Sequence, residues 1–135
     1  MATDPAFAAT VALGGALLGN AETDTLTPTT TSVILTAGAS GSKIEEIVVQ
    51  AAKTGTLVAT TVAGQVYLFL YDGTTYRLFD SILVTAVTAS TTVAPYRQNR
   101  LYTNLVLKSG WSLRASQSVA GNASLLQVFA LGGDF

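Results

Sequence analysis

Apolar and polar residues alternate along most of this chain with the two-residue period of β-strands. Runs rich in Val, Ile, Thr and aromatic residues recur about every 8–12 residues, and Gly, Ser, Asn and Asp separate them. We place strands at Ser32–Thr36, Lys43–Lys53, Gly64–Asp72, Thr75–Val84, Thr91–Arg97, Leu101–Leu107, Trp111–Gln117 and Ser124–Leu131. About eight strands in a single domain predict an all-β fold, a two-sheet antiparallel sandwich of jelly-roll type.

Three segments between these runs have the residue types that tight turns require. Asp72–Thr75 reads DGTT and Lys108–Gly110 reads KSG, so each places a glycine where the backbone can adopt a positive φ. Each of these two predicts a β-hairpin between its flanking strands. The segment Ala120–Ala123, AGNA, separates the last two strands.

The strand at Gly64–Asp72 is apolar on both of its faces. Alternation places aliphatic side chains on one face and aromatic side chains on the other, namely Val66, Leu68 and Leu70 against Tyr67, Phe69 and Tyr71. A two-layer sandwich buries only one face of each sheet in its own core. The second face must therefore be covered by the N-terminal segment, by a loop or by another subunit.

Residues Met1–Thr31 precede the strand pattern and are rich in Ala, Gly and Thr. We expect an extended N-terminal arm over residues 1–31, followed by a sandwich domain over residues 32–135 that folds without residues 2–20. An apolar arm of this kind is too hydrophobic to remain in water, so we expect it to bind a neighbouring molecule. Its candidate anchors are Phe7, Val11, Leu13, Leu17 and Leu18.

The composition favours assembly over catalysis. Seven basic and eight acidic residues make up only 11% of the chain, against about 25% in a typical soluble domain. There is no His and no Cys, and the net charge is −1. We therefore expect no enzymatic activity, no cofactor, no metal of the zinc type and no nucleic-acid partner. Each charge-free run is interrupted by polar or glycine residues, so we expect no membrane partner either.

The positions of the acidic residues give little indication of a catalytic or metal-binding site. Glu45 and Glu46 are adjacent on a strand, so their side chains point to opposite faces. Asp72 belongs to a turn, where a short acidic side chain binds backbone amides. Asp80 lies in the middle of a strand, where we expect it to form a salt bridge or to face water at a sheet edge. A calcium site at Asp72 or Asp80 remains open, although no loop has the spacing of acidic ligands that such sites use.

One segment combines basic and aromatic residues in the manner of a recognition surface. The sequence PYRQNRLY contains Tyr96, Arg97, Arg100 and Tyr102. Tyr and Arg are enriched at protein interfaces, so these four residues join Tyr67, Phe69 and Tyr71 as interface candidates. The alternative is a solvated loop.

Several blocks of the sequence resemble a family of small virion proteins of tailed bacteriophages. The blocks are LTAGASGSKIEEIVVQA at Leu35–Ala51, VYLFLYDGTTYRLFDSILV at Val66–Val84, the segment LVLKSGWSLRAS and the ending VFALGGDF, and the opening MATDPAFAAT is similar as well. The resemblance implies a jelly-roll structural protein without enzymatic activity. It further implies a head decoration (cement) protein, a homotrimer bound to the major capsid protein on the outer surface of the virion and made in the host cytoplasm.

A different virion role remains as the alternative. A component associated with the tail, neck or fibre would bind the host surface or a glycan through exposed aromatic side chains. The candidates for stacking on sugars are Tyr76, Tyr96, Tyr102 and Trp111, of which Trp111 fits the core better because Leu113 and Ala115 share its face.

Overall fold

The computed structural model describes residues 10–18, 20–52, 60–119 and 125–135, and every regular element in these ranges is a β-strand. The strands are β1 (Thr10–Leu18), β2 (Ser32–Thr36), β3 (Ser42–Ala52), β4 (Thr60–Thr61), β5 (Gly64–Tyr71), β6 (Tyr76–Val84), β7 (Val87–Thr88), β8 (Arg97–Leu107), β9 (Ser112–Gln117) and β10 (Leu125–Asp134). Within these ranges no helix is found with the length and apolar character needed to cross a membrane.

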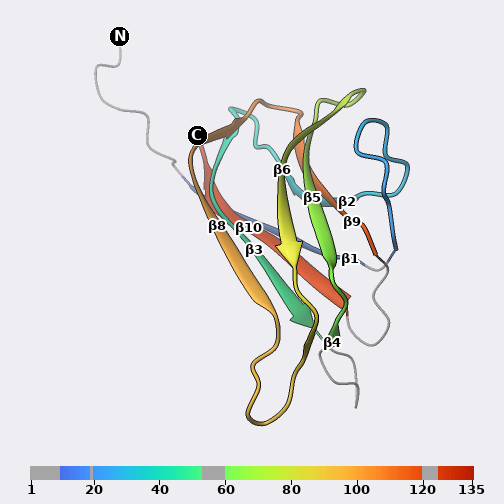
Figure 1. Cartoon of the computed structure of the whole chain (residues 1–135). Coiled ribbons are helices and arrows are strands. Elements are labelled where there is room, and N and C mark those ends of the chain that lie inside the picture. Colours follow the sequence, from blue (N-terminus) through green and yellow to red (C-terminus); the bar gives the residue numbers. More distant parts are fainter. Residues whose placement is uncertain (1–9, 19, 53–59, 120–124) are drawn as a thin grey trace.

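The long strands form two antiparallel sheets of four strands each. Sheet A has the order β1-β10-β3-β8, sheet B has the order β2-β9-β5-β6, and β4 and β7 form a small separate pair. The two sheets lie face to face as the layers of a sandwich (Figure 1). The all-β class and the two-sheet arrangement predicted from the sequence are confirmed.

The hydrophobic core lies between the two sheets. Ile47 and Val128 of sheet A and Leu68 and Leu113 of sheet B have no exposed surface. Each belongs to the set of alternate residues that points inward, as the period of a strand requires. Where β1 and β2 meet, the sheets approach so closely that a Cβ at Gly14 would collide with the carbonyl oxygen of Ile34.

The N-terminal segment differs from the expected arm. Residues 10–18 form β1, and all nine pair with β10 in antiparallel register, from Thr10 opposite Asp134 to Leu18 opposite Leu126. The interpretation of this stretch as an arm is therefore wrong. The glycines and alanines of TVALGGALL weaken the apolar alternation, so the strand was not visible in the sequence. Phe7 lies outside the described residues.

The segment from residue 20 to residue 31 is a folded loop. The Glu22 carboxylate accepts hydrogen bonds from the backbone amides of Asp24, Thr29 and Thr30, at 3.0, 2.8 and 3.0 Å. The Asp24 carboxylate likewise accepts hydrogen bonds from the backbone amides of Leu26 and Thr27. These bonds fold the segment back on itself, which an extended arm does not do.

This loop lies against the outer face of sheet B at Tyr76. Phe69 has no exposed surface, although it points away from the core between the sheets. Pro28 of the loop is buried, and the Thr31 hydroxyl lies 3.1 Å from the Tyr76 hydroxyl on the neighbouring strand β6. Of the three covers considered for this face, the structure brings part of the N-terminal segment, folded as a loop, against Tyr76 on this face.

The two predicted hairpins have different outcomes. Asp72–Thr75 joins the paired strands β5 and β6, with Gly73 at φ 101°, so this hairpin is confirmed. Gly110 adopts φ 83°, but the strands on either side of its turn belong to different sheets. The second hairpin is therefore wrong, because turn residues specify a local bend and not the partner of the next strand. Ala120–Ala123 lies outside the described residues.

Most strand boundaries agree with the alternation to within one or two residues. β10 extends three residues beyond its predicted end, to Asp134. The largest difference is in the region from Thr91 to Leu107, where two strands were expected. The structure has bends and irregular backbone over residues 91–96, and a single long strand, β8, begins at Arg97. The polar stretch QNR, which was interpreted as a connection, continues the strand because it lies on a sheet edge. There Gln98 and Asn99 reach water, and Arg100 binds Asp80.

Candidate interaction surface

The outer face of sheet A carries several exposed apolar side chains. Residues that lie directly opposite one another in a sheet share a face, so the register defines four rows across sheet A. From β1 to β8 the rows are Val11, Gly133, Lys43 and Val106; Leu13, Leu131, Glu46 and Leu101; Gly15, Phe129, Val48 and Asn99; and Leu17, Gln127, Gln50 and Arg97. We call these sixteen residues the sheet A outer face.

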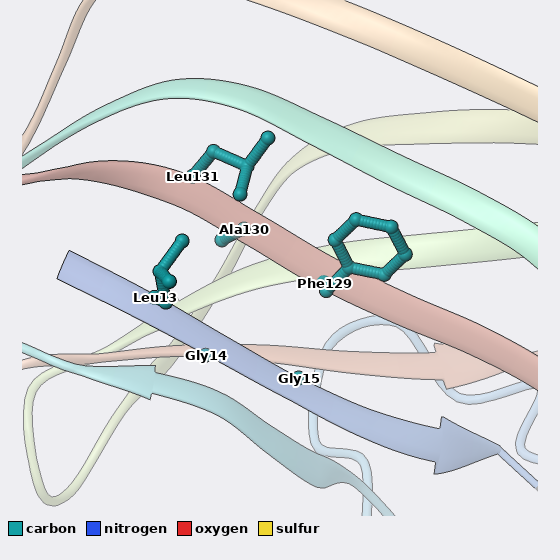
Figure 2. A pocket seen from close by; sticks show the side chains of 6 residues that line it. All are labelled: Leu13, Gly14, Gly15, Phe129, Ala130 and Leu131. Atoms are coloured by element: carbon teal, nitrogen blue, oxygen red, sulfur yellow. The ribbon is translucent and has the colours of Figure 1, made fainter. Parts of the chain in front are cut away.

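The β1 and β10 half of this face is apolar except for Gln127. Val11, Leu13 and Leu17 have 76%, 65% and 51% of their surface exposed. Beside them, Leu13, Gly15, Phe129 and Leu131 line a shallow depression of about 370 Å³ (Figure 2). The row positions on β1 and β10 carry no charged side chain. Exposed apolar side chains gathered in this way are typical of interaction sites.

The β3 and β8 half of the face carries its charges. Glu46 accepts a hydrogen bond from the Asn99 amide at 3.0 Å, and Lys43 lies 3.6 Å from the bulged Glu45. Arg97 is exposed at the end of its row. Leu101 and Val106 add apolar surface on β8, with 72% and 52% exposure. The sheet A outer face is thus apolar at its β1 side and mixed at its β8 side.

The predicted anchors of the N-terminal segment fall on both sides of β1. Val11, Leu13 and Leu17 belong to the sheet A outer face, where they are free to contact a partner. Leu18 points the other way and is buried in the core of its own chain. As an interface candidate Leu18 is therefore wrong, because the alternation of a strand, which an arm lacks, turns it inward.

The aromatic candidates on β5 lie on the outer face of sheet B. Phe69 is fully buried within the protomer and offers no surface to a partner, so its assignment to an interface is wrong. Tyr71 stacks on Tyr76 at 4.3 Å between ring centroids, and the Arg114 guanidinium lies 4.3 Å from the Tyr71 centroid. Tyr67 is half-buried on the same face. These rings stabilise the outer side of sheet B from within the chain.

The basic-aromatic segment is divided among several environments. Tyr96 is buried and donates its hydroxyl proton to the Leu83 carbonyl at 2.6 Å, so it too is wrong as an interface candidate. Arg100 and Tyr102 point from β8 toward β6, away from the outer face. Only Arg97 lies on the sheet A outer face.

Asp80 is the centre of a polar cluster that links the two sheets. Arg100 Nη1 donates to both Asp80 carboxylate oxygens, at 2.8 and 3.0 Å, and the Tyr102 hydroxyl donates to one of them at 2.7 Å. Burial, reinforced by the Asp80 carboxylate, raises the pKa of the Tyr102 hydroxyl, which therefore stays protonated as a donor. The salt bridge expected for Asp80 is confirmed.

The other acidic residue considered for a calcium site belongs to a turn. Asp72 accepts hydrogen bonds from the amides of Thr74 and Thr75 and from Arg77 Nη1 at 2.7 Å. The structural role predicted for it is confirmed. Among the described residues, no group of three or more His, Cys, Asp or Glu side chains lies close enough together to hold a metal ion.

Sequence reasoning missed the apolar side chains that β10 and β8 contribute to the sheet A outer face, namely Phe129, Leu131, Leu101 and Val106. One signal was present in the sequence. The run LLQVFAL at Leu125–Leu131 is apolar at adjacent positions, as the β5 strand is, and a strand apolar on both faces needs a second cover.

Comparison with known proteins adds no family to this description. The chain matches no protein-family model, and no curated protein and no solved structure shows significant similarity to it.

The carboxylates in turns predict how stability depends on pH. The Arg77 guanidinium and two backbone amides hold the pKa of Asp72 well below its usual range, and backbone amides lower the pKa values of Glu22 and Asp24. A lowered folded-state pKa stabilises the fold above the ordinary carboxyl pKa, and this contribution is lost as the pH falls through the folded-state value. Since the chain has no His, we expect a constant melting temperature from pH 8 to about 5 and a decline below about pH 4.

Thermal unfolding followed by circular dichroism across this pH range measures the effect. The Asp72→Asn variant should lose part of the acid dependence while unfolding cooperatively at pH 7. A melting temperature that rises on acidification, or a transition centred between pH 6 and 7, would contradict the assignment.

Proposed function

We propose that the protein is a non-enzymatic structural subunit of a tailed-bacteriophage virion, which binds the outside of the head as a decoration (cement) protein. The observation that carries the proposal is the β1 and β10 half of the sheet A outer face, where Val11, Leu13 and Leu17 are exposed. A shallow depression lined by Leu13 and Phe129 lies on the same half. A surface of this kind gains free energy by contact with another protein, at about 25 cal/mol for each Å² of apolar area buried. In a lattice many copies repeat the contact, so a modest energy for each copy stabilises the whole shell.

The order of the strands supports the jelly-roll part of this proposal. When the two short strands β4 and β7 are left out, the remaining eight are numbered one to eight along the chain. Sheet A then reads 1-8-3-6 and sheet B reads 2-7-4-5, with every neighbouring pair antiparallel. This is the order obtained when one long hairpin is rolled into two sheets of Greek-key connectivity, which is the architecture of many viral capsid domains.

The contacts of the ionisable side chains also favour a structural role. Asp72 pairs with Arg77 and Asp80 with Arg100, and Glu22 and Asp24 bind backbone amides of their own loop. Each of these groups stabilises a turn, a loop or the junction of two sheets.

The aromatic residues considered for glycan binding have partners in their own chain. Tyr96 is buried, Tyr102 donates to Asp80, and Tyr76 stacks on Tyr71. Trp111 packs against the core and lies 5.3 Å from the Arg77 guanidinium. The geometry therefore favours the head over a glycan-binding role at the tail.

Quantitative mass spectrometry of purified phage particles that contain this protein tests the proposal. A decoration protein should be present in hundreds of copies for each particle, whereas a tail, neck or fibre component should be present in a few. Particles stripped of the protein should bind the wild-type protein and should bind a Leu13→Asp variant at least ten-fold more weakly, because a charge enters the apolar half of the face. A low copy number, or full binding by this variant, would overturn the proposal.

A further inference from the structure

The free edge of β1 lacks the devices that normally protect the edge of a sheet. Within the described residues β1 pairs on one side only, with β10, and it ends the order of sheet A. Its sequence TVALGGALL contains no charge and no proline over nine residues. The opposite edge of the same sheet, β8, carries Arg97, Arg100 and several amide side chains. Long apolar edges without such protection pair with a further strand.

We propose that a second copy of this chain is the strand that pairs with β1. The two β1 strands run antiparallel about a two-fold axis at Gly14, the middle residue of β1, and they join two copies of sheet A into one sheet of eight strands. This self-association uses Leu13, which also lies on the face proposed to bind the capsid, but its test measures only the oligomeric state of the purified protein. It differs from the homotrimer that the family resemblance implies.

The length of β1 selects the register of this contact, because among two-fold antiparallel pairs the one centred on Gly14 pairs all nine residues of the strand. In a two-fold antiparallel pair centred on Gly14, this residue lies opposite its own copy in the partner subunit. Each residue that precedes Gly14 then faces the residue that follows Gly14 by the same number of positions. Val11 then faces Leu17 of the partner subunit, and Leu13 faces Gly15 of the partner subunit. All nine residues of β1 are paired, and no charge meets another charge across the axis. The apolar side chains of both copies lie on the same outer face, because opposed residues share a face.

The surface beside Gly15 is shaped for the side chain that this register brings to it. Gly15 has no side chain, so the depression between it, Leu13 and Phe129 stays open (Figure 2). A leucine from the partner subunit, opposite Gly15, enters this depression from its open side. Large and small residues thus alternate along β1 in a self-complementary way, with Leu13 meeting Gly15 on both sides of the axis.

The size of the contact predicts its strength. A nine-residue strand edge is roughly 30 Å long and roughly 10 Å deep, which gives roughly 300 Å² for each copy. This is well below the roughly 800 Å² for each partner that a standard stable interface buries. The backbone hydrogen bonds of the new ladder add to the apolar contact, so we expect a dimer with a dissociation constant in the micromolar range.

A charge pair across the axis tests the register directly. In the full-length protein, Val11→Glu and Leu17→Lys should each weaken the dimer by about ten-fold, because a charge then faces an apolar residue. The double variant Val11→Glu/Leu17→Lys should restore the dimer to within about three-fold of wild type, since each Glu then faces a Lys across the interface. Within one chain the two positions are six residues apart, about 20 Å along the strand, so they cannot compensate each other.

Analytical ultracentrifugation and native mass spectrometry at roughly 1–100 µM measure the association, and circular dichroism confirms that each variant is folded. Leu101→Lys is the matched control, because it places the same charge on the same face at the far edge of the sheet, and it should leave the dimer unchanged. Single variants without effect, a double variant weaker than both singles, or a wild-type protein that is monomeric or trimeric would each overturn the proposal.

Discussion

Removing residues 10–18 is expected to abolish folding. The deletion takes away the nine residue pairs between β1 and β10 and exposes the edge of a strand that is central in sheet A. It also removes Ala12 and Leu18 from the core between the sheets. Since the net stability of a domain is about 5–15 kcal/mol, the loss of one of eight long strands exceeds what the fold can tolerate.

Far-UV circular dichroism and proton NMR dispersion of the deletion variant measure the outcome. The matched control replaces Val11, Leu13 and Leu17 by Thr in the full chain, which keeps β1 and changes only exposed side chains. Because Thr is well accepted in strands, this control should stay within about 1 kcal/mol of wild type. A cooperative unfolding transition of the deletion variant near the wild-type temperature would show that β1 is dispensable, as a passive arm would be.

The Phe69→Ala variant should lose about 3–5 kcal/mol of folding free energy, the usual cost of removing a fully buried aromatic ring. The ring packs edge-on against Tyr76 at 5.8 Å between ring centroids, and the Tyr76 hydroxyl contacts Thr31 at the end of the loop. Its loss leaves a cavity on the outer side of sheet B and weakens the attachment of the loop. Chemical denaturation at several protein concentrations measures the effect.

The dependence on concentration distinguishes burial within the chain from burial at an interface. If Phe69 packs inside the protomer, its contribution is the same at every protein concentration. The Leu101→Ala variant serves as the control, since that side chain is exposed, and it should change stability by less than about 0.5 kcal/mol. A Phe69→Ala effect that disappears on dilution would place the ring at a subunit contact.

The parts of the fold that the sequence predicted are those with strong local signals. The alternation in β5 and the glycine of the Asp72–Thr75 turn are readable because both the period and the turn chemistry are properties of neighbouring residues. The pairing of β1 with β10 is not such a property, since Thr10 and Asp134 are at opposite ends of the chain. Likewise, a turn at Gly110 gives no sign that the chain passes from one sheet to the other.

The candidate surface was predicted in part for the same reason. Val11, Leu13 and Leu17 were identified because they are apolar residues outside the expected core, and they do lie on an exposed face. Phe69 and Leu18 share that property in the sequence, but long-range packing buries both. Only tertiary structure tells these two groups apart.

The pairing of the first strand with the last has a consequence for synthesis in the cell. The long strands pair in a nested order, β1 with β10, β2 with β9, β3 with β8 and β5 with β6, so only the innermost pair is local in sequence. At about 5–20 residues per second, β1 leaves the ribosome on the order of ten seconds before its partner exists. During that time its apolar residues have no native strand to pair with. The yield of folded protein should therefore depend on translation speed, temperature and chaperone capacity more than on the stability of the finished sandwich.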